Sequence, residues 1–243
     1  MGIKRIIARL DVKNNYVIKG IHLEGLRKIG DPNELAKNYY NNGIDEIVFM
    51  DAVASYYDRN SLNEIIERAC NDVFVPITVG GGIRKIKDIH TALRAGADKI
   101  AINTAAVKDP NFLTKASKTF GSQSIVSSIE AKKNNNFWEV YIDNGREPTG
   151  LDVLDWVKKV QDLGAGEIML TSVDMEGTKK GFDIELNKLV SEICSIPIIS
   201  SGGAGNTNDI LKLFKETNVD AAAVASILHY NLCEIDTIKN LEL

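Results

Sequence analysis

The chain has 243 residues, of which 44% are hydrophobic and 26% are charged. These proportions are typical of one ordinary globular domain with a large core. The net charge is −4, and no basic stripe interleaved with aromatic residues predicts nucleic-acid binding. No apolar run approaches the roughly 18 residues of a membrane span, and no signal peptide is recognisable. We therefore expect a cytoplasmic protein that binds neither nucleic acid nor membrane.

Cysteine and histidine residues give no sign of a metal site. Cys70, Cys194 and Cys233 are far apart and odd in number, so they match neither a disulfide framework nor a zinc motif. The three histidines are scattered, with no pair at a ligand spacing. We expect reduced thiols and no bound metal.

Short apolar runs alternate with longer amphipathic stretches along the chain. The runs are near-continuous, as expected for parallel strands that are buried on both faces. The predicted strands, in chain order, are Lys4–Asp11, Glu46–Asp51, Val75–Val79, Lys99–Ile102, Ser124–Glu130, Glu167–Thr171, Ile196–Ser200 and Ala221–Ala225. The helical patterns between them include Asn33–Asn42, Ser61–Cys70, Ile86–Ala95, Leu151–Leu163 and Asp209–Glu216.

The alternation of strands and helices predicts the fold. The first helix has a clear start, with Asp31 as N-cap, Pro32 at the first helical position and Glu34 in the first turn. The extra run Phe137–Ile142 is expected to form a hairpin after the fifth strand. Eight alternations at this length predict a single-domain (β/α)8 TIM barrel over residues 1–243. An open, doubly wound sheet is the alternative.

The sequence also repeats itself. "VPITVGGGI" from Val75 resembles "IPIISSGGA" from Ile196, and "GIDEIVFMD" from Gly43 resembles "GAGEIMLTS" from Gly164. These and two further pairs of segments are offset by about 120 residues. The repeat predicts two homologous half-barrels, about 1–120 and 121–243, so a site in one half should have a counterpart across the barrel mouth.

Two glycine clusters end corresponding strands of the two halves. They are Gly80–Gly82 and Ser201–Gly203, and the next strands are followed by Asn103-Thr104 and by Ala225-Ser226. Glycine lets consecutive backbone N–H groups approach one anion. Phosphate sites on barrels commonly follow strands seven and eight. The pattern predicts two phosphate sites and a substrate phosphorylated at both ends, with plain tight turns as the alternative.

Charged residues mark both ends of the predicted barrel. Asp11 and Glu130 end strands one and five, which face each other across the axis, and such a pair could remove a proton on one side of a substrate and deliver one on the other. Two ordinary strand-end carboxylates are the alternative. A second set begins strands one, two, four and six, at the floor of the barrel: Arg5, Glu46, Lys99 and Glu167. Position alone favours a ring of ion pairs that closes the floor.

Nearly the whole chain resembles one enzyme family, the cyclase subunit of imidazole glycerol phosphate synthase from histidine biosynthesis. The resemblance rests on segments such as "KRIIARLDVK", "TVGGGI", "INTAAV", "TGLDVLDWV", "GAGEIMLTS", "GTKKGFD" and "SGGAG". It implies a lyase that uses ammonia from a partner glutaminase, in a heterodimer. The implied substrate is a ribulosyl aminoimidazole carboxamide nucleotide with a phosphate at each end. The implied products are imidazole glycerol phosphate and aminoimidazole carboxamide ribotide, and no cofactor takes part.

The resemblance also implies roles for individual residues. It makes Asp11 the general base and position 130 the general acid, with Asp98 on the glutaminase docking face. The four floor charges would form an ammonia gate. The residues implied in substrate binding are Lys19, Gly82, Asn103, Thr104, Glu176, Gly177, Gly203 and Ser226.

Three positions depart from the family's pattern. The family has aspartate at Glu130 and Glu176, and a small residue, usually cysteine, at Arg9. Arg9 shares strand phase with Asp11, so it should point into the barrel, along the ammonia route or against Asp11. These departures leave two alternatives open. One is a divergent paralogue that passes ammonia to a sugar-amidating enzyme, and the other is a non-catalytic barrel that activates the glutaminase. The related isomerase of the same pathway shares the barrel but lacks the floor ring.

Overall fold

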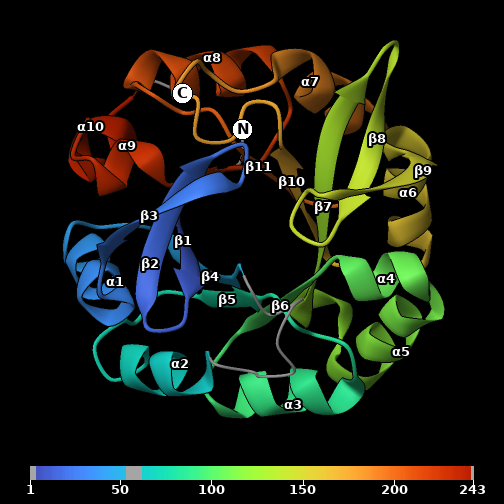
Figure 1. Ribbon diagram of the computed structural model, residues 1–243, viewed down its shortest axis with the longest axis horizontal. Coiled ribbons are helices and arrows are strands. Elements are labelled where there is room, and N and C mark those ends of the chain that lie inside the picture. The colour runs from blue at the N-terminus through green and yellow to red at the C-terminus, as the bar shows by residue number, and fades with distance from the viewer. Residues whose placement is uncertain (1–3, 53–61, 242–243) are drawn as a thin grey trace.

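A closed ring of parallel strands forms the centre of the protein (Figure 1). The computed structural model describes residues 4–52 and 62–241. Within them, the barrel strands are β1 (Arg5–Lys13), β4 (Glu46–Asp51), β5 (Ile77–Gly80), β6 (Lys99–Ile102), β7 (Ile125–Asn134), β10 (Glu167–Ser172), β11 (Ile198–Ser201) and β12 (Ala221–Val224). Strand β12 pairs with β1, and β10 pairs with β7, which closes the ring. The predicted (β/α)8 barrel is confirmed, and the open-sheet alternative is wrong.

Helices surround the ring (Figure 1). They are α1 (Pro32–Asn41), α2 (Asn63–Ala69), α3 (Ile86–Arg94), α4 (Thr104–Lys108), α5 (Asn111–Phe120), α6 (Val153–Asp162), α7 (Ile184–Ile193), α8 (Thr207–Glu216), α9 (Ser226–His229) and α10 (Ile235–Lys239). Helix α1 begins as predicted, because the Asp31 carboxylate accepts backbone N–H groups of Asn33 and Glu34. The predicted start of the second helix, Ser61, lies outside the described residues. Among those residues, no helix is long and apolar enough to cross a membrane.

Two strands begin two residues later than predicted, and proline explains the difference. Strands β5 and β11 start after Pro76 and Pro197, whose nitrogen atoms have no hydrogen to donate to a neighbouring strand. Their carbonyl groups still accept hydrogen bonds, from Ile47 N–H and Ile168 N–H.

Two hairpins lie across the face of the ring seen in Figure 1. One consists of β2 (Tyr16–Ile21) and β3 (Glu24–Gly30), and the other of β8 (Phe137–Ile142) and β9 (Glu147–Asp152). They follow β1 and β7, the first strands of the two halves, which is consistent with two homologous half-barrels. The second hairpin was predicted from Phe137–Ile142, whereas the first was not. Strand β3 is half exposed and mostly polar, so it lacks the apolar alternation that marks a strand.

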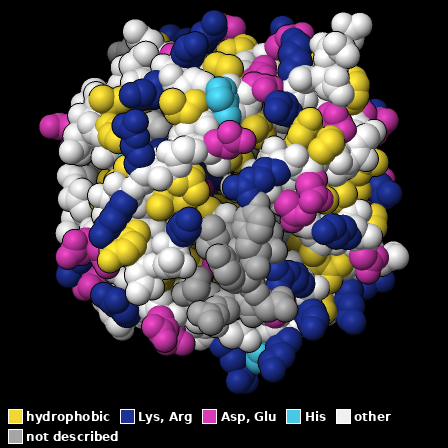
Figure 2. Space-filling view, viewed as in Figure 1, with side chains coloured by type: hydrophobic (Ala, Val, Ile, Leu, Met, Phe, Trp, Pro, Cys, Tyr) yellow, Lys and Arg dark blue, Asp and Glu magenta, His cyan; other side chains and the backbone are white. Residues whose placement is uncertain are grey.

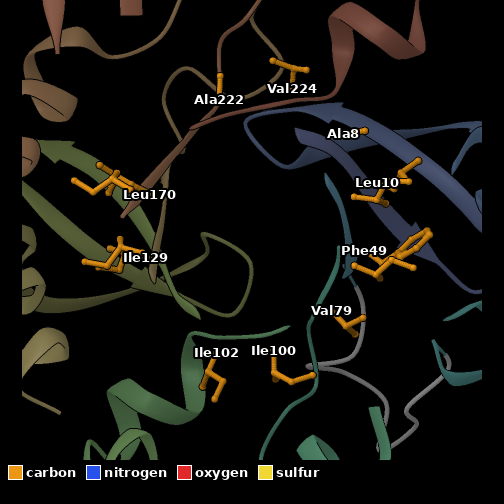
Figure 3. Close-up of a cluster of buried hydrophobic side chains, with 14 of the residues drawn as sticks. Ala8, Leu10, Phe49, Val79, Ile100, Ile102, Ile129, Leu170, Ala222 and Val224 are labelled. Atoms are coloured by element: carbon orange, nitrogen blue, oxygen red, sulfur yellow. The ribbon is translucent and has the colours of Figure 1, made fainter. Parts of the chain in front are cut away.

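Strand residues alternate between two apolar regions. Residues that point outward, such as Leu10, Phe49, Ile129 and Leu170, pack beneath the helices (Figure 3). Residues that point inward form a smaller apolar layer inside the barrel, composed of Ile7, Val48, Ala101, Val126, Met169, Ile199, Ala221 and Ala223. This inner layer separates polar groups at the floor from polar groups at the mouth.

Candidate active site

Asp11 and Glu130 lie on opposite sides of the barrel mouth. Asp11 is on β1 and Glu130 is on β7, and three strands separate them in either direction around the ring. Both side chains are almost fully buried. The structure therefore places the two carboxyl groups as the sequence predicted, and their catalytic roles stay predictions.

The carboxyl group of Glu130 is held in a site that favours its protonated form. Its Oε2 atom accepts hydrogen bonds from Asn103 Nδ2 at 3.0 Å and from the backbone N–H of Gly145 at 2.8 Å. Burial raises the pKa of Glu130 to about 7, although the Gly145 N–H and the positive charge of Arg9 oppose that rise. Near neutral pH this group can therefore donate a proton.

Asp11 lies in the opposite electrostatic environment. Burial would raise its pKa, but the charges of Arg9 and Lys19 outweigh burial and lower it. Arg9 Nε donates to Asp11 Oδ1 at 2.9 Å, and Lys19 Nζ lies 3.6 Å from Oδ2. Two carboxyl groups whose environments separate their pKa values in this way can serve as a base and an acid in one reaction.

Lys19 connects the first hairpin to the second half of the barrel. Its ammonium group forms a buried ion pair with Glu176, in the loop after β10, and burial lowers the pKa of Lys19 to about 8. The backbone N–H of His22 donates to the Glu176 carbonyl at 2.8 Å. A Cβ atom on Gly177 would lie 2.1 Å from the carbonyl oxygen of Gly20, so this contact requires glycine. These contacts hold the β2–β3 hairpin over the mouth of the barrel.

The first predicted phosphate region is a cavity of about 450 Å³. Gly82, Asn103 and Thr104 line it together with Lys108 and Glu130. Gly82 has a φ of 70°, in the left-handed region that favours glycine. The structure brings this predicted set together beside Glu130, and its phosphate role stays a prediction.

The second predicted phosphate region lies across the mouth. Gly177 and Ser226 line a cavity of about 560 Å³ with Lys19, Arg27 and Lys179. Gly203 lines a small adjoining pocket that Gly177 and Ser226 share. Lys and Arg side chains are spread over the face that carries both hairpins (Figure 2). The predicted residues therefore meet at one place, lined by cationic side chains as an anionic ligand requires.

The four charged residues at the floor form a closed ring. Arg5 contacts Glu46 at 2.9 Å and also contacts Glu167, while Lys99 lies 2.9 Å from Glu46 and 2.8 Å from Glu167. Thr78 Oγ1 donates to Glu46 at 2.7 Å. Charges of opposite sign thus alternate around the barrel axis. This arrangement confirms the predicted ring of ion pairs, and a gate function remains a proposal.

The sequence matches the profile of the histidine biosynthesis protein family over residues 5–234. The chain belongs to this family. Three relatives are each named imidazole glycerol phosphate synthase subunit HisF. The protein from Legionella pneumophila is 57% identical over 206 residues, which cover 84% of this chain and 97% of that protein. The proteins from Pyrococcus furiosus and Bacillus cereus are 49% and 47% identical, and each alignment covers 97% of this chain and 94% of the relative.

Three features of this family member were not predicted from its sequence. The Glu130 contact with Gly145 depends on a turn in which Asp143, Asn144 and Gly145 all have positive φ. The Asp-Asn-Gly sequence was the only available signal for that turn. Lys19 and Glu176 were both assigned to the substrate, but they contact each other. Asp98, expected at a docking face, is exposed and also accepts the backbone N–H of Ile77 at 2.8 Å.

Proposed function

We propose that this chain is the cyclase subunit of imidazole glycerol phosphate synthase. In this proposal ammonia reacts with a ribulosyl aminoimidazole carboxamide nucleotide that carries a phosphate at each end. The products are imidazole glycerol phosphate and aminoimidazole carboxamide ribotide. The observation that carries the proposal is the pair of opposed carboxyl groups, one with a lowered pKa and one with its pKa raised to about 7, between two cavities with glycine and cationic side chains.

The reaction needs one group that accepts protons and another that donates them. Condensation of ammonia with the ketone of the ribulosyl arm removes protons from nitrogen and delivers a proton to the oxygen that leaves as water. The new nitrogen then closes the imidazole ring on the carbon that joins the two halves of the substrate, the bond from that carbon to the ribotide nitrogen breaks, and the ribotide leaves as an amine after it takes up a proton. Asp11, held ionised, would accept protons, and Glu130, with a pKa of about 7, would donate them. Gly82 and Thr104 would hold one phosphate, and Gly203 and Ser226 the other. The ion-paired Lys19 and Glu176 would contact the part of the nucleotide that lies between the two phosphates.

The floor ring supports the second part of the proposal, a glutaminase partner. Ammonia made outside the barrel would enter beneath Arg5 and Lys99, pass the apolar inner layer and reach the two carboxyl groups. A neutral molecule can cross that layer, because it carries no charge to desolvate. We place the heterodimer interface at the floor, beside Asp98, and the complex in the cytoplasm, where the three free cysteines would stay reduced.

A steady-state assay with the purified chain tests the proposal. The nucleotide and an ammonium salt should yield the two products in equal amounts, with a rate that saturates in both reactants. No turnover at any ammonium concentration would refute the cyclase. If such an inactive chain still stimulates a glutaminase, the result would favour the paralogue that passes ammonia to a sugar-amidating enzyme.

A further inference from the structure

Arg9 places a permanent positive charge inside the barrel. It is the β1 residue two positions before Asp11, and its side chain is only 3% exposed. Arginine does not lose its proton in proteins, so burial cannot neutralise it as burial neutralises lysine or a carboxyl group. A buried charge of this kind is strongly unfavourable unless it is paired and hydrogen-bonded.

The guanidinium group has partners on three strands. Its Nε atom donates to Asp11 Oδ1 at 2.9 Å, and its Nη1 atom donates to Thr171 Oγ1 at 2.9 Å and to Ser201 Oγ at 3.1 Å. Thr171 and Ser201 are on β10 and β11, so the side chain extends past β12. The inward residues of β12 include Ala221 and Ala223, whose small side chains leave that space open.

These contacts fix the direction of the Asp11 carboxylate. The nitrogen atoms of a guanidinium group lie in one rigid plane, so the two hydroxyl groups that hold Nη1 also orient Nε. Nε in turn holds Asp11 Oδ1, and the other oxygen, Oδ2, is left toward Lys19. Thr171 and Ser201 lie two residues after Met169 and Ile199, so this network sits directly on the mouth side of the inner apolar layer.

We propose that Arg9 is a positioning residue that holds Asp11 ionised and aims its other oxygen, Oδ2, at the reacting nitrogen. The inference deepens the proposed function, since it rests on Asp11 being the base. Arg9 acts through Asp11 and needs no contact with the substrate. A side chain that merely filled the interior could be replaced by an apolar one of similar length without changing the titration of Asp11.

Several charged groups around Asp11 contribute to its titration. Lys19 on β2 adds a second positive charge, and Glu176 partly neutralises it. His229 on α9 and Glu130 on β7 also act on it. Among the residues that the structure describes, only Arg9 is both permanently charged and hydrogen-bonded to Asp11 at a short distance, so its removal should have the largest effect.

The test compares Arg9→Met, Arg9→Lys and the exposed control Arg94→Met. The titration of Asp11 is followed by ¹³C NMR of aspartate-labelled protein, and its signal is assigned with Asp11→Asn. The native signal should remain that of a carboxylate between pH 5 and pH 9. In Arg9→Met the midpoint should rise by about three pH units, because burial is then opposed mainly by Lys19, in Arg9→Lys by less, and in Arg94→Met not at all. An unchanged midpoint in folded Arg9→Met would overturn the proposal.

Kinetics provide the second readout, at a constant concentration of un-ionised ammonia. In Arg9→Met, kcat should fall at least tenfold at pH 6 and less than threefold at pH 8.5, while KM for the nucleotide changes less than threefold. An equal loss at both pH values would contradict the proposal. If Arg9→Met does not fold, Arg9→Lys takes its place in both measurements. An Arg9→Lys protein with full activity and an unchanged Asp11 titration would then contradict the positioning role of Arg9. If the native chain has no turnover, the cyclase proposal fails, whereas the NMR titration still tests Arg9.

Discussion

The side-chain amide of Asn103 donates a 3.0 Å hydrogen bond to the carboxyl group of Glu130. Asn103 also lines the first predicted phosphate cavity, directly before Thr104. One residue therefore joins the place where a phosphate would bind to the group that would donate the proton. The longer side chain of glutamate, compared with the aspartate of the family pattern, is accommodated because Asn103 and Gly145 both hold its end.

Glu130 should determine the basic limb of the pH profile. Its pKa of about 7 predicts that kcat/KM falls above pH 7, as the acid loses its proton. Glu130→Gln should reduce turnover on the order of 100- to 10,000-fold, the usual contribution of a general acid. The exposed Glu147→Gln is the matched control. A Glu130→Gln enzyme with native activity and an unchanged basic limb would show that another group supplies the proton.

Asp11→Asn keeps the size of the side chain and removes its basicity. We expect kcat to fall on the order of 100-fold or more, whereas the exposed Asp72→Asn should leave kcat unchanged. The comparison is made with saturating ammonium salt, so that delivery from a partner plays no part. If Asp11→Asn retains turnover within about threefold, a barrier change below 1 kcal/mol, the assignment of Asp11 as base is wrong.

Lys99→Met should affect turnover with ammonia from glutamine more than turnover with ammonia from an added ammonium salt. The substitution removes two of the four ion pairs of the floor ring, those of Lys99 with Glu46 and with Glu167. We expect glutamine-dependent turnover with a glutaminase partner to fall about tenfold, while ammonium-dependent turnover changes less than threefold. The exposed Lys37→Met, which breaks only the surface pair with Asp72, should change neither rate. Equal losses in both assays would argue against a gate.

His229 should make stability fall in mild acid. Its Nδ1 atom is paired with the Tyr39 hydroxyl at 2.8 Å, and burial lowers its pKa to about 4, below the usual value of 6.5. Between these values the unfolded chain binds the proton and the folded chain does not, so folding weakens as pH falls. The free energy of unfolding should therefore decrease between pH 7.5 and pH 5, and His229→Gln should make that decrease about 2 kcal/mol smaller. Urea unfolding measures it, with exposed His90→Gln as control, and an unchanged pH dependence in His229→Gln would contradict the prediction.

The sequence predicted the site residues that lie on barrel strands, because the alternation of side chains along a strand determines which of them point inward. The barrel strands are near-continuous apolar runs, so their approximate positions and their inward residues follow from the alternation of side chains along a strand. Arg9, Asp11 and Glu130 were placed inside the barrel in this way. The repeat then predicted that Asp11 and Glu130 would oppose each other, as they do.

The sequence did not predict contacts made by loops and long side chains. The Lys19–Glu176 ion pair joins residues from different halves of the chain, and neither residue lies on a barrel strand. The orientation of the Arg9 guanidinium depends on the small side chains of β12 and on the hydroxyl groups of Thr171 and Ser201. Such contacts arise from tertiary packing, which strand periodicity does not encode.

The most direct test of an ammonia-dependent cyclase is the ratio of product to glutamine consumed in the complex with its glutaminase. The measurement counts imidazole glycerol phosphate and glutamate in the same reaction, at low external ammonium. If ammonia passes the floor ring and the inner apolar layer to Asp11 and Glu130, each glutamine hydrolysed should yield one imidazole glycerol phosphate. Glutamate formed at full rate with no imidazole product would contradict the account.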